Sequence, residues 1–302
     1  MNETALSSLE EKFSMKVMRD AVIKSAGFLD AVYGDSNFVF LRNEKYISSV
    51  LNNPDISAVF TTEEIAARIK SDNIGIVVSD NPEKLFFEVH NYLVEEKFYG
   101  EDIENSISRT AVIADNVYIA SNNVIIGENV VIEPNVSILG HVKIGNNCYI
   151  GAGTVLGGRG FKYYRDADVT IHMQQAGWTD IGDNVEILSN TCIERGIIDD
   201  TVIGENTMIS SHVTISHGVK IGRGSAISAG AALAGAVEVD DGVWIGLNAS
   251  VKQKVRIGEK AYICMGAVVT KNVEPGQKVS GNFAVEHEKN IANVKQIAGL
   301  QL

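Results

Sequence analysis

Cysteine, proline and tryptophan are scarce in this 302-residue chain, which contains three, four and two of them. Cys148, Cys192 and Cys264 have neither paired spacing nor a CxxC motif, which argues against a disulfide framework and favours a reducing, cytoplasmic location. No apolar run approaches the ~20 residues of a membrane-spanning helix. Residues 1–16 also lack the charged-then-apolar order of a signal peptide. We therefore expect neither a membrane span nor export.

Basic residues are also in short supply, with 26 Lys and Arg against 38 Asp and Glu, a formal net charge of −12. Binding to nucleic acid needs a basic face for the phosphates, so the composition argues against a nucleic-acid partner. It also disfavours docking of an acidic carrier protein. The chain is 45% hydrophobic and 21% charged, and its length suits one repetitive domain beside a second small one.

A six-residue repeat is the dominant feature of the second half of the sequence. Neither the 3.6-residue helical period nor strand alternation produces strict sixes, whereas three short strands wound into a triangular coil do. The repeat therefore predicts a parallel β-helix of hexapeptide type. Its branched aliphatic positions are Ile203, Ile209, Ile215, Ile221, Ile227, Leu233, Val239, Ile245, Val251, Ile257, Ile263 and Val269.

The same repeat begins near residue 126 and is interrupted by a long insertion at 157–180 and a ten-residue step from Ile193 to Ile203. Eight or nine coils at the ~4.8 Å strand spacing would make a prism about 40 Å long. Residues 1–100 do not follow the repeat and predict an α/β domain, with strands at 37–41, 56–60 and 74–78 and helices at 45–51, 62–70 and 82–95. We assign the β-helix to 107–283 and a tail with a short helix to 284–302.

Three further motifs carry functional information: FLRNEKY at 40–46, GTVLGG followed by GFKY at 153–163, and the segment 181–220 that contains ISHGV. In this order they resemble the UDP-3-O-acylglucosamine N-acyltransferase family of lipid A synthesis and its relatives that acylate nucleotide-linked amino-deoxysugars. The resemblance covers both domains. It implies a left-handed β-helix and a homotrimer with active sites in the grooves between prisms.

The resemblance also implies roles for single residues. His217 would be the general base that takes the proton from an attacking amine, since an imidazole can accept a proton at neutral pH. The backbone N–H of Gly235, one coil later, would stabilise the oxyanion of the tetrahedral intermediate. The sugar nucleotide would be bound by Phe40, Asn43, Tyr46, Phe161, Tyr163 and Arg195. Coenzyme A would be bound by Gly235, Lys254, Lys271 and Asn272.

Several positions depart from the lipid A pattern. Ser210 and Ser211 replace acidic and amide residues, Gly218 replaces an asparagine, and VVTKNVEPG at 268–276 with GNFA at 281–284 resembles the ending of hexapeptide transferases that use coenzyme A. We therefore expect transfer of an acetyl or short 3-hydroxyacyl group from coenzyme A to the amine of a dTDP- or UDP-linked amino-deoxysugar, for surface polysaccharide. In this interpretation acyl-CoA is a co-substrate and no cofactor is permanently bound. The alternative is the lipid A reaction with acyl carrier protein.

Two other classes remain open. The spacing of His212 and His217 resembles two metal ligands of γ-class carbonic anhydrases, but zinc would need a third histidine, and the nearest, His172, lies in an irregular loop. We therefore predict no metal site. A trimeric scaffold without ligands is the other alternative. A sugar nucleotidyltransferase is disfavoured because residues 1–100 contain no Gly-rich phosphate loop.

Overall fold

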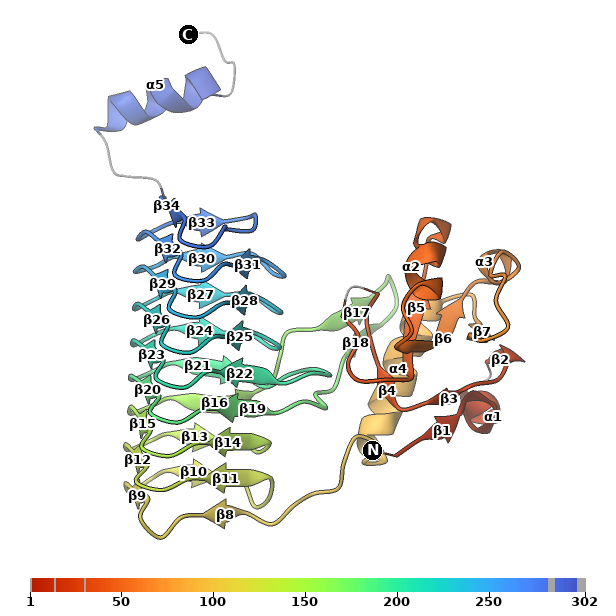
Figure 1. Cartoon of the computed structure of the whole chain (residues 1–302), viewed down its shortest axis with the longest axis horizontal. Coiled ribbons are helices and arrows are strands. Elements are labelled where there is room, and N and C mark those ends of the chain that lie inside the picture. Colours follow the sequence, from red (N-terminus) through yellow and green to blue (C-terminus); the bar gives the residue numbers. More distant parts are fainter. Residues whose placement is uncertain (1, 14, 30, 282–285, 298–302) are drawn as a thin grey trace.

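The computed structural model describes the chain except residues 1, 14, 30, 282–285 and 298–302. It shows a tall triangular prism of stacked coils with an α/β unit at its side, joined by the linker before β8 and by the β17–β18 hairpin (Figure 1). The predicted left-handed parallel β-helix is confirmed: three parallel sheets of eight, eight and nine strands form the three faces of the prism. This agrees with the predicted number of coils.

Each coil contributes one short strand to each face. The site face contains β10 (Tyr118–Ile119), β13 (Ser137–Ile138), β16 (Val155–Gly158), β21 (Cys192–Glu194), β24 (Thr214–Ile215), β27 (Ala232–Leu233), β30 (Ser250–Val251) and β33 (Val268–Val269). The charged face contains β8 (Ser106–Ile107), β11 (Val124–Ile126), β14 (Val142–Ile144), β19 (Thr179–Ile181), β22 (Thr201–Ile203), β25 (Lys220–Ile221), β28 (Glu238–Val239) and β31 (Arg256–Ile257). The apolar face contains β9 (Val112–Ile113), β12 (Val131–Ile132), β15 (Tyr149–Ile150), β20 (Glu186–Ile187), β23 (Met208–Ile209), β26 (Ala226–Ile227), β29 (Trp244–Ile245), β32 (Tyr262–Ile263) and β34 (Lys278–Val279).

The aliphatic side chains of the six-residue repeat fill the inside of the prism. Every repeat position from Ile203 to Val269 is buried in one continuous apolar core, and the stacked coils bring identical positions into register. Glycine after the repeat position has a clear reason: a Cβ on Gly204 would lie 2.6 Å from the backbone nitrogen of Arg223 in the next coil. Turn asparagines such as Asn206 adopt positive φ, which asparagine tolerates better than most residues.

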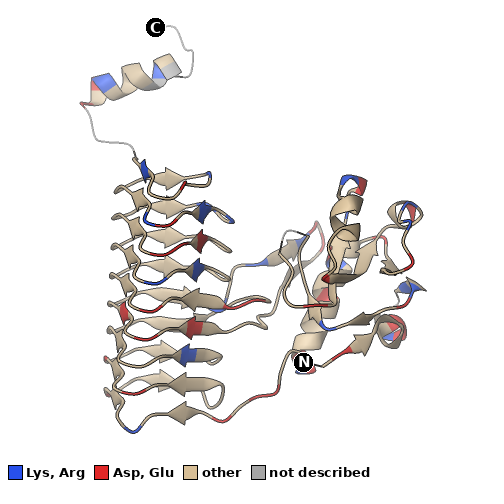
Figure 2. Ribbon diagram, in the orientation of Figure 1, with Lys and Arg blue, Asp and Glu red and all other residues tan. Residues whose placement is uncertain are grey.

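The outward side chains distinguish two faces. On the charged face, Lys143 and Asp180 lie on neighbouring strands, Val202 follows on the next strand, and Lys220, Glu238 and Arg256 alternate in charge beyond it (Figure 2). Lys143 Nζ lies 3.1 Å from Asp180 Oδ2. Opposite charges on neighbouring strands suit contact with water. The apolar face differs, because its exposed side chains include Met208, Trp244 and Tyr262.

The first hundred residues form a five-stranded sheet in the order β2-β7-β6-β5-β4. Sheet strand β5 and helix α4 have the predicted bounds, while β6 and β7 each differ from the predicted range by one residue and α3 is shorter than predicted. The elements are β1 (Thr4–Ala5), η1 (Leu6–Leu9), α1 (Glu10–Phe13), β2 (Lys16–Arg19), β3 (Val22–Ile23), β4 (Ser25–Ala26), β5 (Asn37–Leu41), η2 (Glu44–Tyr46), α2 (Ile47–Leu51), β6 (Ile56–Thr61), α3 (Glu63–Ala66), β7 (Gly75–Val78) and α4 (Pro82–Glu95).

The insertion at 157–180 joins the two units. It forms an antiparallel hairpin of β17 (Tyr163–Arg165) and β18 (Thr170–His172), and buried Tyr164 and Met173 share the apolar core of the α/β unit. His90 of α4 is fully buried and bridges Tyr99 Oη and the carbonyl of Gln174, each at 2.9 Å. The hairpin therefore holds the α/β unit in a defined position beside the prism.

The predicted tail helix is present as α5 (His287–Ile297), which stands beyond the last coils rather than against them (Figure 1). Asn282, Phe283 and Ala284 of the predicted GNFA motif, and residues 298–302 of the tail, lie outside the described residues. Within the described ranges, no helix has the length and apolar character needed to cross a bilayer.

Candidate active site

His217 lies at the corner where the chain leaves the site face at β24 and turns onto the charged face at β25. Strand register stacks the corners of successive coils. Gly235, Gln253 and Lys271 therefore follow His217 up one column, with Lys254 and Asn272 one residue further along the upper turns. The residues predicted to bind coenzyme A thus share one edge of the prism, because an 18-residue coil returns them to the same corner.

The imidazole of His217 is held by packing rather than by a hydrogen-bonded partner. Neither ring nitrogen has a hydrogen-bonding partner among the described residues, and the ring lies between two glycines. A Cβ on Gly235 would lie 2.7 Å from Cε1 and 2.8 Å from Nε2, and one on Gly160 would lie 3.2 Å from Cδ2. Burial, together with the positive charge of Lys162, lowers the pKa of His217 to about 4. The ring is therefore neutral at pH 7, and its one unprotonated nitrogen can accept a proton.

The backbone around Gly235 leaves a donor available. Its carbonyl accepts from the N–H of Lys254 at 3.1 Å, and the N–H of Ala236 donates to the carbonyl of His217 at 3.0 Å. The N–H of Gly235 itself donates to no group among the described residues. An unused N–H beside a neutral imidazole has the chemistry that an oxyanion would need.

Glu194 connects His217 to the loop that covers it. The backbone N–H of His217 donates to Glu194 Oε2 at 2.9 Å, and the N–H of Phe161 also bonds to this carboxylate. Burial raises the pKa of Glu194, and these two N–H groups oppose the shift. Phe161 is 82% exposed and packs edge-on against Tyr163, so its aromatic ring is open to a ligand.

A pocket of about 160 Å³ surrounds the imidazole. The α/β unit contributes one wall, the insertion a second and the column of corners a third. Its lining residues are Phe28, Ala31, Tyr33, Phe161, Lys162, Ile197, Ile198, Asp199, His217, Gly218, Gly235, Ala236, Gln253 and Lys254. The structure thus brings together four of the predicted residues: His217, Gly235, Phe161 and Lys254.

The other predicted residues lie elsewhere in the chain. Phe40 is partly buried against Phe86, with ring centroids 5.2 Å apart. The Asn43 side chain caps η2 by accepting from the N–H of Lys45 at 3.1 Å, and Tyr46 is 42% exposed with the Lys45 ammonium over its ring. None of the three lines the pocket at His217.

Tyr163 contacts Phe161 and His172 with its ring and does not line the pocket. Arg195 lies in a separate pocket described below. Lys271 and Asn272 line a small pocket near the top of the prism, where Asn272 Oδ1 accepts from the N–H of Arg256 at 3.0 Å.

Sequence reasoning missed Glu194 and the contribution of Phe28 and Tyr33. Glu194 had a usable signal, because strand register pairs Ile193 with Ile215 and so sets Glu194 beside the residues just before His217. The β4–β5 segment that supplies Phe28 and Tyr33 carries no such signal. Within the described residues no three His, Cys, Asp or Glu side chains gather as a metal site, and His212 is exposed.

Comparison with known proteins agrees with this architecture. The model of bacterial transferase hexapeptide (six repeats) matches residues 123–158 and 200–235, and the hexapeptide repeat of succinyl-transferase matches 237–271. These stretches of the chain therefore contain hexapeptide repeats, and the structure winds them into a left-handed β-helix. The chain's curated relatives carry a more particular name. It is 31% identical over 154 residues to the UDP-3-O-acylglucosamine N-acyltransferase of Delftia acidovorans, covering 50% of this chain and 46% of that protein.

A second relative of the same name, from Saccharophagus degradans, is 45% identical over 71 residues, which are 24% of this chain and 21% of that protein. The chain thus matches between about a fifth and a half of the length of these relatives. Among solved structures, the UDP-N-acetylglucosamine acyltransferase of Campylobacter jejuni is similar with a TM-score of 0.48 and 24% identity, covering 64% of this chain and 76% of that one.

Proposed function

We propose that this chain is an N-acyltransferase that moves an acyl group from a thioester to the amine of a nucleotide-linked amino sugar. The observation that carries the proposal is the pairing of His217 and Gly235: a neutral imidazole faces a corner N–H, and neither the ring nor that N–H is hydrogen-bonded to any described residue. General-base and oxyanion chemistry need these two groups within reach of one reacting carbon.

In the proposed reaction the neutral amine attacks the thioester carbonyl and forms the C–N bond. His217 takes the proton that the nitrogen must lose, while the N–H of Gly235 donates to the oxyanion. Collapse of the intermediate breaks the C–S bond, and the imidazolium returns the proton to the departing thiolate. The products are an amide and a free thiol, and the base is restored without any permanently bound cofactor.

The pocket at His217 encloses only the reacting end of such substrates. Its volume of about 160 Å³ is below the ~300–1,000 Å³ of typical small-molecule sites. We propose that the rest of the site forms between copies of the chain in a homotrimer. The exposed Met208, Trp244 and Leu247, which line an apolar groove of about 410 Å³, support this, because an apolar patch on a solvent face marks an interface.

We assign the sugar nucleotide to Phe40, Asn43 and Tyr46 as the resemblance implies, with the exposed ring of Tyr46 offering a stacking surface for the base. The acyl donor would run up the column from Gly235 past Lys254 to Lys271 and Asn272. All three cysteines are free thiols, which supports a reducing, cytoplasmic setting for the reaction.

Two acceptors are candidates. The names of the curated relatives favour a UDP-3-O-acylglucosamine over the dTDP-linked amino-deoxysugar that the sequence departures suggested. A specific observation keeps the second candidate: the small volume of the pocket at His217 suits a short acyl group from coenzyme A.

The test is a free-thiol assay of acetyl-CoA, 3-hydroxybutyryl-CoA and a 3-hydroxymyristoyl carrier protein, each against UDP- and dTDP-linked amino sugars. Turnover with the carrier protein and UDP-3-O-acylglucosamine alone would support the first acceptor. Turnover with a short acyl-CoA and a deoxyaminosugar would support the second. Absence of thiol release in every combination would reject acyl transfer.

A further inference from the structure

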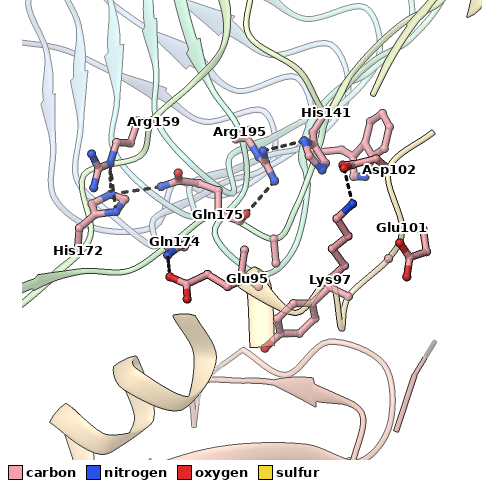
Figure 3. Close-up of a pocket in the computed structure, with 15 residues that line it drawn as sticks. Glu95, Lys97, Glu101, Asp102, His141, Arg159, His172, Gln174, Gln175 and Arg195 are labelled. Carbon is pink, nitrogen blue, oxygen red and sulfur yellow. Dashed lines mark hydrogen bonds and ion pairs between the residues drawn. The ribbon is translucent and has the colours of Figure 1, made fainter. Parts of the chain in front are cut away.

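A second pocket, of about 500 Å³, lies where the linker and the end of α4 meet the prism. Figure 3 shows its charged side chains: Arg159 with His172 at one end, Arg195 with His141 towards the other, and Lys97 with Asp102 beyond them. It shares no lining residue with the pocket at His217. Its size is within the usual range for a nucleotide or a similar small molecule.

The hydrogen-bonding partners of Arg195, a partly buried cation, are all neutral, and the charge of Asp200 opposes the lowering of its pKa by burial. Its guanidinium donates to the carbonyls of Gly177 and Gln175 and to Nδ1 of His141, each at 2.8 Å. In the described structure no carboxylate lies within 4.0 Å of it. These bonds use three of the five N–H groups, so two remain for a further acceptor.

Arg159 is a second guanidinium of this pocket that contacts no carboxylate among the described residues, and its side chain is exposed. Its Nε lies 3.1 Å from both ring nitrogens of His172, and Nε2 of His172 also lies 2.9 Å from the carbonyl of Gly160. In the part of the chain that the structure describes, no carboxylate lies within 4.0 Å of the Arg159 guanidinium.

The acidic side chains at this pocket are largely occupied. Asp102 lies 2.8 Å from the ammonium of Lys97 and accepts from Asn123 at 2.7 Å, and Glu95 accepts from Gln174 at 2.8 Å. In a chain with twelve more acidic than basic residues, carboxylates to pair with arginine are abundant. Two arginines that bond to no carboxylate in one cavity of the described structure point to an external anion, because guanidinium groups bind phosphate and carboxylate oxygens through forked hydrogen bonds.

We propose that this pocket binds a phosphorylated small molecule, whose phosphate oxygens accept from Arg159 and Arg195 in the forked geometry that guanidinium groups favour. The site goes beyond the proposed acyl transfer. It also lies behind the loop that covers His217: Arg159 belongs to this pocket, Gly160 packs on the His217 ring, and Phe161 and Lys162 line the other pocket. Bound phosphate would hold that loop in place.

The experiment titrates the full-length protein with UDP and with inorganic pyrophosphate by calorimetry, without acyl donor, so that failure of acyl transfer does not affect the result. Arg159→Gln should weaken pyrophosphate binding about tenfold or more. Arg165→Gln, an exposed arginine on the same hairpin, is the matched control and should bind as the wild type does. Arg159 is exposed, so the variant is expected to fold.

Two further variants separate the sites. Lys162→Gln changes the pocket at His217 and Tyr46→Ala changes the assigned nucleoside surface, and neither should alter pyrophosphate binding. Equal affinity of UDP and pyrophosphate at the Arg159-dependent site would mean that the pocket recognises the phosphate groups alone. Tighter binding of UDP would mean that the pocket also contacts the nucleoside. The proposal is rejected if no pyrophosphate binds at millimolar concentration, or if Arg159→Gln and Arg165→Gln bind alike.

Discussion

The imidazole of His217 lies against Gly235 of the next coil so closely that a Cβ there would sit 2.7 Å from Cε1. Eighteen residues separate the two along the chain, one full coil of the prism. This close approach positions the imidazole and leaves no room for a side chain at position 235. The contact between His217 and Gly235 therefore joins the two groups proposed to act in catalysis, which makes it a suitable target for mutation.

His217→Ala should lower kcat by about two orders of magnitude or more, because the proposed general base is removed. Stability should change little, since the ring makes no hydrogen bond in the described structure. The comparison is His212→Ala, an exposed histidine of the same turn series, which should retain kcat. Thiol release measured for both variants, with thermal melts, provides the test. Near-normal turnover in His217→Ala would mean that the amine needs no base here.

Gly235→Ala should reduce kcat by about tenfold or more while the protein stays folded. The added methyl group would push the imidazole, because its Cβ would lie 2.8 Å from Nε2, and catalytic geometry tolerates displacements of about an ångström poorly. Gly158→Ala is the matched control, since its nearest atom would be 3.6 Å away. Equal kcat in the two variants would show that displacing the His217 imidazole does not affect catalysis.

Glu194 should behave as a positioning residue. Replacement by Ala leaves the N–H groups of His217 and Phe161 without their shared acceptor, and replacement by Gln restores one oxygen. We expect kcat to fall in the order wild type, Glu194→Gln, Glu194→Ala, with a smaller effect on thermal stability than on turnover. Steady-state kinetics with parallel melts test this order. A purely structural role would lower the melting temperature and leave kcat per folded molecule unchanged.

The buried histidines should make the fold sensitive to acid. Burial lowers the pKa of His90 to about 4 from 6.5, so above pH 6.5 the ring is neutral in both the folded and unfolded states. As the pH falls from 6.5 towards 4, only the unfolded chain binds the proton, and the free energy of unfolding decreases. For His90 the loss is on the order of 2 kcal/mol at pH 5.

This acid sensitivity is measured by urea unfolding at pH 7 and pH 5. His90→Gln removes the titrating group and should reduce the difference in stability between the two pH values, although it also weakens the contact with Tyr99 and Gln174. An unchanged difference would assign the acid sensitivity to other groups, of which His141 and His217 also have lowered pKa values.

The apolar face should govern assembly. Trp244→Glu places a charge among exposed apolar side chains, which disfavours burial of that face. We expect the proposed trimer to dissociate in sedimentation experiments and turnover to fall with it. Glu238→Gln, on the charged face, should leave the assembly intact. A protein that sediments as a monomer before any substitution would contradict the trimer.

The repeat could be predicted from the sequence because its cause is local. Each coil needs a branched aliphatic residue inside and a small residue at each close approach, so positions such as Ile215 and Gly204 reveal the prism without any knowledge of the fold. The bounds of α4 were predictable for a similar reason, since Asn81 caps it and Pro82 begins it. The resemblance of ISHGV directed attention to His217.

Tertiary structure alone decided what surrounds His217. Glu194 reaches it from β21, and Phe28 and Tyr33 reach it from the β4–β5 segment. Their positions depend on how the insertion packs on α4 through Tyr164 and His90. The tertiary structure also placed Arg195 in a pocket that Phe40, Asn43 and Tyr46, with which the sequence grouped it, do not line. A periodic core can be predicted because each coil repeats the same short sequence pattern. A pocket between two domains depends on contacts between residues far apart in sequence, which no local pattern predicts.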